Sequence, residues 1–162
     1  MEQVHHLAAV GTDQTDYSLS IAEQLDEAGQ VPRETFSTAI TCIDGRVHPP
    51  VVSWMRSLFS VAHVDLITEP GPDQVEARAP DRARELLRPK VALSVTGHAS
   101  RLLVLAGHYD CLANPVAEEE HREQLRQAVP VLLSWDLGVQ VVAVWVNASW
   151  QIEVVKARPA PA

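Results

Sequence analysis

The stretch "STAITCIDGRVHPPVVSWMRSLFS", residues 37–60, contains both kinds of segment from which the fold is built. Its first part, 37–44, is apolar and rich in β-branched residues, which predicts a buried strand. Two prolines then open 49–60, where Val52 and Met55 recur at helical spacing. A strand that gives way so quickly to a helix is typical of α/β proteins.

The same alternation continues along the chain. Further strands are predicted in 64–72 (running into a Pro/Gly loop), 101–108, 139–149 and 150–157. Further helices are predicted in 16–30, in 79–99 divided near Pro89, and in 117–138 disturbed at Pro130 and ended by Gly138. This order predicts a mostly parallel central sheet with helices on both faces. The last two strands are too close for a helical crossover, so we expect an antiparallel edge hairpin.

Composition limits the class of protein. The 162 residues are 46% hydrophobic and carry a formal net charge of -8, which argues against a nucleic-acid partner. We expect one α/β domain over 35–157, an N-terminal segment with a short helix over 1–34, and a disordered tail over 158–162. No apolar run approaches the ~20 residues of a membrane span. With two cysteines and no recognisable secretion signal, a cytoplasmic location is expected.

Both cysteines follow predicted core strands. Cys42 ends the first strand, and Cys111 comes three residues after His108, at the end of another. In open parallel sheets, ligands bind beyond the carboxyl ends of the strands, so these three side chains could converge. Two thiolates and an imidazole suit Zn2+, and three protein ligands leave one position open. The spacing therefore predicts a catalytic type of zinc site.

Asp44 and Arg46 follow Cys42 closely. A carboxylate two residues beyond a ligand could reach the open metal position or a water molecule there. An arginine can hold such a carboxylate through two parallel hydrogen bonds. The pair could also be an ordinary strand-end salt bridge.

The pattern Cys-x-Asp-x-Arg, followed about 60 residues later by Gly-His-x-x-Cys, resembles the β-class carbonic anhydrases. The resemblance extends over 35–157, including the order of strands and helices. It implies reversible hydration of CO2 to bicarbonate by a zinc-bound hydroxide, in a homodimer or higher homo-oligomer. It also implies that Cys42, His108 and Cys111 bind zinc. Asp44 and Arg46 would then form the catalytic dyad.

The sequence departs from that family at three places. Gly45 replaces the usual Ser, Leu112 replaces a Gly, and "TEPGPD" at 68–73 replaces an Arg-Asn-Ala-Gly stretch. These changes fall around the substrate pocket and leave two alternatives open. One is hydrolysis of carbonyl sulfide or carbon disulfide by the same attack, and the other is a zinc-stabilised module without turnover.

Four other features have more ordinary interpretations. His48 could shuttle protons, but it also fits a solvated loop histidine. Asp110 is expected to satisfy backbone donors in its turn. Trp150 is assigned to packing, and the run "AEEEH" at 117–121 to a solvated helix start.

Overall fold

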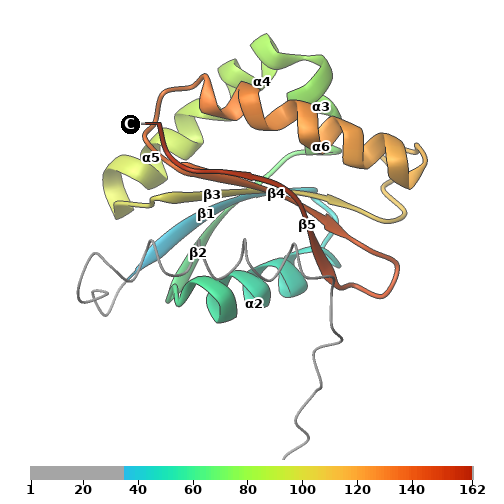
Figure 1. The fold of residues 1–162 in the computed structure, drawn as a ribbon, viewed down its shortest axis with the longest axis horizontal. Helices are drawn as coiled ribbons and strands as arrows, with labels where there is room; N and C mark the ends of the chain where they lie inside the picture. The colour runs from blue at the N-terminus through green and yellow to red at the C-terminus, as the bar shows by residue number, and fades with distance from the viewer. Residues whose placement is uncertain (1–34, 162) are drawn as a thin grey trace, which may run out of the picture.

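A five-stranded sheet forms the centre of the protein (Figure 1). The computed structural model describes residues 35–161, so the helix expected within 16–30 lies outside the described residues. The strands are β1 (Phe36–Thr41), β2 (His63–Thr68), β3 (Leu102–His108), β4 (Gln140–Val146) and β5 (Ile152–Arg158). Their order is β2-β1-β3-β4-β5; all neighbours are parallel except β4 and β5. The predicted mostly parallel sheet with an antiparallel edge hairpin is confirmed.

The helices cover the two faces of the sheet unequally (Figure 1). They are α2 (His48–Phe59), α3 (Pro72–Arg78), α4 (Pro80–Leu86), α5 (Arg88–His98) and α6 (Glu118–Leu133). In the described part of the chain, α2 covers one face and the other four helices cover the opposite face. Successive strand residues serve different cores, since Ala39 packs in the α2 core and Ile40 in the other. Within residues 35–161, no helix combines the length and apolar character that crossing a membrane requires.

Three helical details differ from or refine the predictions. The division near Pro89 is confirmed, because α4 ends at Leu86 and α5 begins at Arg88. Helix α3 was not predicted; its short sequence directly follows the Pro/Gly loop and offers no long apolar period. Helix α6 ends at Leu133, before the predicted stop at Gly138.

Pro130 lies inside α6 and is accommodated by a side chain from the sheet. Proline has no N–H, so it cannot donate to the carbonyl four residues earlier, that of Arg126. Lys156 Nζ on β5 donates to this carbonyl instead, at 3.0 Å. The helix therefore continues past Pro130 without leaving the Arg126 carbonyl unsatisfied.

The strand order changes direction between β1 and β3. From β1 the chain passes through α2 to β2 on one side, whereas from β3 it passes through α6 to β4 on the other. Connections that leave neighbouring strands in opposite directions open a crevice at the carboxyl ends of those strands. The register pairs Thr38 with Leu103 and Ile40 with Leu105, so β1 and β3 end side by side at that crevice.

Glu76 on α3 is a buried acid without a hydrogen-bond partner in the described part of the chain. Its residue has no exposed surface, and neither carboxylate oxygen finds a partner among residues 35–161. Burial in an apolar environment disfavours the charged form and raises the pKa of Glu76 to about 8. The folded protein therefore keeps this carboxyl protonated at a pH where the unfolded chain releases the proton.

We expect the wild type to lose stability as pH rises, because Glu76 ionises only in the unfolded state. Glu76→Gln should not show this loss. Below the ordinary pKa of 4.5, Glu76 is protonated in both states. Between that pH and about 8, only the unfolded state ionises, so the free energy of unfolding falls by on the order of 3 kcal/mol at pH 7.

Urea unfolding at two pH values, one near each end of that interval, measures the effect. The glutamine variant should gain stability over the wild type at the higher pH only. Glu85→Gln removes an exposed carboxyl on α4 and serves as the control. An equal difference between wild type and Glu76→Gln at both pH values would contradict the prediction.

Candidate metal centre

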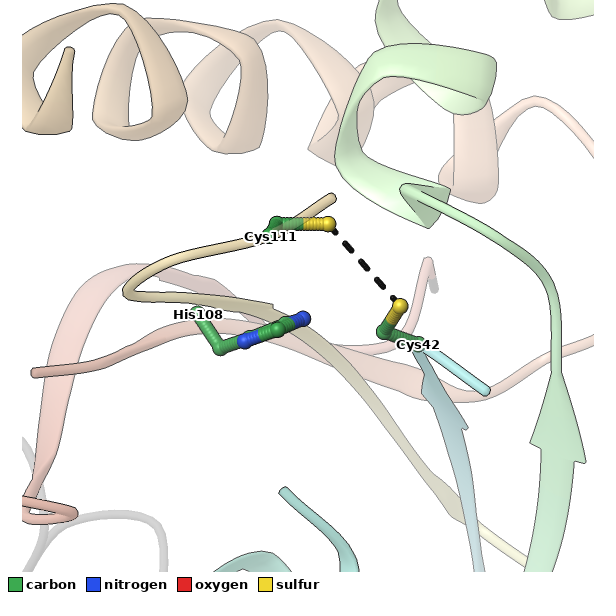
Figure 2. A group of neighbouring side chains, drawn as sticks. All are labelled: Cys42, His108 and Cys111. Atoms are coloured by element: carbon green, nitrogen blue, oxygen red, sulfur yellow. Dashed lines mark hydrogen bonds between the residues drawn. The ribbon is translucent and has the colours of Figure 1, made fainter. Parts of the chain in front are cut away.

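Three potential metal ligands meet at the crevice between β1 and β3. Cys42 directly follows β1, His108 is the last residue of β3, and Cys111 lies in the turn beyond. Their ligand atoms all lie within 4.8 Å of one another, and all three residues are buried. Figure 2 shows the imidazole and the two sulfur atoms directed toward one another, with the sulfur atoms 3.9 Å apart. The convergence expected from the sequence is therefore present, while metal ligation itself stays a prediction.

A tight turn after β3 brings Cys111 back toward His108. The N–H of Tyr109 donates to the carbonyl of Val146 at 2.8 Å, which ties the start of the turn to β4. Asp110 then adopts a left-handed conformation with φ of 58°, which aspartate tolerates better than most residues. The turn thereby places two ligands from one short segment in the same crevice.

The first strand is shorter than the predicted 37–44, because β1 ends at Thr41. The chain turns immediately afterwards, and the N–H of Val47 donates to the carbonyl of Asp44 at 3.1 Å. Cys42 and Asp44 therefore lie in the connection to α2, outside the strand.

The tautomer of His108 is set by its neighbour. Nδ1 lies 2.8 Å from the carbonyl of Tyr109, and a carbonyl only accepts, so Nδ1 carries the proton. Nε2 is buried and has no hydrogen-bond partner among residues 35–161, although it lies within 4.8 Å of the two sulfur atoms. A histidine that binds a metal through one nitrogen usually donates the other N–H to such an acceptor. A neutral imidazole with its proton on Nδ1 can bind a metal ion through Nε2.

The two sulfur atoms are within hydrogen-bond distance, and each changes the pKa of the other. The hydrogen bond with Cys111 lowers the pKa of Cys42, and the backbone N–H of Gly71 adds to this effect. The same bond, together with burial, raises the pKa of Cys111. The thiol–thiol hydrogen bond therefore favours ionisation of Cys42 over ionisation of Cys111. A metal ion would allow both sulfurs to ionise, since coordination deprotonates a thiol.

Arg46 holds Asp44 firmly beside this group. Its Nε lies 3.0 and 3.1 Å from the two oxygens of the carboxylate, and its Nη2 lies 2.6 Å from Oδ2. The backbone N–H of Arg46 also donates to Oδ1 at 3.0 Å. The hydrogen bonds from Arg46 lower the pKa of Asp44 to about 2, so Asp44 is an acceptor at any physiological pH. Asp44 is not a member of the three-residue group of ligand atoms.

Arg46 also contacts Asp110 and Trp150, for which other roles were predicted. Its Nη1 lies 3.4 Å from Oδ2 of Asp110, and its guanidinium lies 5.1 Å from the centre of the Trp150 ring. Together with Asp44, these two residues orient the guanidinium from three sides. The contacts with Asp110 and Trp150 join residues far apart in the chain, so sequence spacing could not predict them.

Two histidines differ from their predicted surroundings. His48 was expected in a loop, but it begins α2, and its Nε2 donates to the carbonyl of Cys42 at 2.9 Å. His121 was included in a solvated helix start, but it is only 2% exposed. A signal for its burial exists, since His121, Leu125, Ala128 and Leu132 follow the helical period.

Comparisons with known proteins agree with this arrangement. The sequence model of a family described as "Putative carbonic anhydrase" matches residues 32–156. The solved β-carbonic anhydrase isoform I of the protozoan Trichomonas vaginalis matches with a TM-score of 0.50 and 11% identity, over 89% of this chain and 98% of that chain. The β-carbonic anhydrase CafA of the fungal pathogen Aspergillus fumigatus gives 0.50 and 11%, over 88% and 86%. A search of curated proteins gives no significant match.

At such low identity the two solved structures establish a shared fold alone. The family model, however, spans most of the sequence, including both segments that carry the candidate ligands. The chain therefore belongs to the carbonic anhydrase family, and its fold is that of the β class.

Proposed function

We propose that this protein is a zinc-dependent carbonic anhydrase that interconverts CO2 and bicarbonate. The observation that supports this most is the buried convergence of Cys42, His108 and Cys111 at the crevice of a β-carbonic-anhydrase fold. The substrate is small and apolar, so it needs only a dry approach and a few polar groups at the reacting atoms.

The residues present fit zinc. Two sulfur donors and an imidazole are a common zinc set, and His108 offers a buried nitrogen that has no hydrogen-bond partner within 35–161. When bound, zinc would supply a nucleophile at neutral pH by lowering the pKa of water. Both cysteines are free thiols, which agrees with our proposal of a cytoplasmic location, where a reducing environment preserves them.

Asp44 is proposed to orient the attacking nucleophile. It is ionised, so it accepts a hydrogen bond from an O–H group and directs the remaining lone pair toward the substrate carbon. Arg46 fixes the carboxylate through both oxygens, which limits its rotation. Asp44 is partly open to solvent, with 19% of its side chain exposed, so substrate can reach it.

The altered loop at 68–73 has a supporting role in the structure. The N–H of Glu69 donates to the carbonyl of Thr41 at 3.0 Å, which joins the loop to the residue before Cys42. Pro72 then begins α3. These contacts give the altered loop a structural role that does not require a different substrate. We therefore treat sulfide release from carbonyl sulfide or carbon disulfide as a control assay.

Asp44→Ala should lower the rate of CO2 hydration by about 10²- to 10⁴-fold, because the nucleophile is no longer oriented. Zinc content should stay unchanged, since Asp44 is outside the ligand group. Stopped-flow hydration with metal analysis checks both. Asp110→Asn is the matched control, because it alters another carboxylate that contacts Arg46. Wild-type rates in Asp44→Ala would favour a zinc-stabilised module without turnover.

Cys111→Ser should lower both zinc content and hydration rate, because a hydroxyl is a much weaker zinc ligand than a thiolate. Ala113→Ser introduces the same side chain at an exposed position in the same loop and should retain both properties. Metal analysis after dialysis against a weak chelator measures the difference. Full zinc retention by Cys111→Ser would exclude Cys111 as a ligand.

We further propose that the protein is a homo-oligomer. Three large apolar side chains beside the candidate ligands are exposed: Ile43 (59%), Tyr109 (50%) and Leu112 (89%). Apolar residues grouped around a functional site commonly mark an interface. A second copy of the chain that covered them would also exclude water from the metal centre.

The double substitution Ile43→Ser/Leu112→Ser should shift the protein toward monomer, because it removes apolar area from the proposed interface. Analytical ultracentrifugation at several concentrations measures the change. Leu93→Ser alters another exposed leucine (71%), located on α5, and should leave the mass unchanged. A monomeric wild type would disprove the proposal.

A further inference from the structure

A buried polar cluster lies between α3 and α6, outside the group of candidate ligands. It consists of Asp73 (1% exposed), Asn114 (0%), His121 (2%) and Gln124 (1%). His121 Nδ1 donates to Asp73 Oδ2 at 2.5 Å, and Asn114 Nδ2 lies 3.2 Å from the same oxygen. Asn114 Nδ2 also donates to Gln124 Oε1 at 2.7 Å. Polar groups are costly to bury, and an apolar set could fill the same volume. Packing alone therefore does not account for these buried polar residues.

The cluster touches the segment that carries His108. Gly107 directly precedes this histidine, and a Cβ atom added at Gly107 would lie 3.0 Å from Oδ2 of Asp73. The Asp73 carboxylate therefore packs against the backbone at the end of β3. Movement of Asp73 would change the support beneath His108.

The cluster also holds the segment that carries Cys111. The backbone N–H of Asn114 donates to the carbonyl of Cys111 at 3.3 Å. The side chain of Asn114 is fixed at the same time by Asp73 and Gln124. The turn that presents Cys111 is thus joined to α3 and α6.

The third connection leads to Cys42. Gly71 lies two residues before Asp73, in the loop whose Glu69 N–H donates at 3.0 Å to the carbonyl of Thr41, the residue before Cys42. A Cβ atom added at Gly71 would lie 3.1 Å from Cβ of Asn114, and its φ of 55° is one that side chains rarely adopt. Asn114 therefore packs against the backbone of the loop that bonds to β1 beside Cys42.

We propose that Asp73, Asn114 and His121 are positioning residues for the metal centre. One buried cluster contacts the segments that present His108 and Cys111, and it contacts the 68–73 loop, which bonds to β1 beside Cys42. It thereby fixes the separation of the ligands before metal binds. This role rests on the proposed zinc site. It differs from simple packing of α3 on α6, because packing alone would stabilise the fold without affecting metal affinity.

Three variants test the role: Asp73→Asn, His121→Phe and Asn114→Ala. Asn114→Ala leaves the buried Asp73–His121 pair intact, so it reports on the cluster even if a charge-altering variant fails to fold. Thr38→Val is the matched control, because Thr38 is equally buried and bonds to Ser94 and Ser100 at 2.7 and 2.8 Å. It lies within β1, four residues before Cys42, and its hydrogen bonds go to α5 and to the residue Ser100 before β3.

Zinc affinity is measured by competition with a chromogenic chelator, and ligand geometry by the visible spectrum of the cobalt-substituted protein. Each variant of the cluster should weaken zinc binding by about 10-fold or more and alter the cobalt bands. Thr38→Val should lower the free energy of urea unfolding yet retain wild-type affinity and spectrum.

Two results would overturn the proposal. One is wild-type zinc affinity and cobalt spectra in Asn114→Ala together with any folded variant of Asp73 or His121. The other is a wild-type protein that binds no zinc, which would also remove the proposed function. A wild type that binds zinc without hydrating CO2 would disprove the proposed function alone, because the affinity measurements do not depend on turnover.

Discussion

The pairing register between β1 and β3 is the constraint on which the candidate site depends. Ile40 lies opposite Leu105, so the chain leaves β1 at Cys42 close to where β3 ends at His108. A slip of one residue would move one partner by about 3.3 Å and turn its side chains to the other face of the sheet. The alternating cores resist such a slip, because Ala39 and Ile40 are both fully buried on opposite faces.

Much of the fold could be predicted because its signals are local. The apolar runs that became β3 and β4 are buried along their whole length, as expected for central parallel strands. The division near Pro89 follows from the chemistry of proline. Helix α3 was missed because its seven residues are too few to show a hydrophobic period. In addition, two of its three buried residues are the acids Asp73 and Glu76. A polar residue in the core gives no hydrophobic signal in a sequence.

The candidate site was predictable to a similar extent. The three ligands could be proposed because their residue types and their positions after strands both carry information. The supports could not, because they come from contacts between distant segments. His121 bonds to a residue 48 positions away, and Arg46 contacts Asp110 from 64 positions away. Pro130 and Lys156 show the same limit, since the lost helical bond is replaced from a strand 30 residues beyond Arg126.

The separation of the two cysteines along the chain also determines when the centre can form. Cys42 and Cys111 are 69 residues apart, and the parallel strands that bring them together belong to the slow, long-range part of folding. Local structure in the unfolded chain cannot assemble the three ligands. A metal ion would therefore encounter its full set of ligands only after β1 has paired with β3. Metal binding would therefore mainly slow unfolding, because it stabilises the folded protein after the ligands have assembled. It would have little influence on the rate of folding.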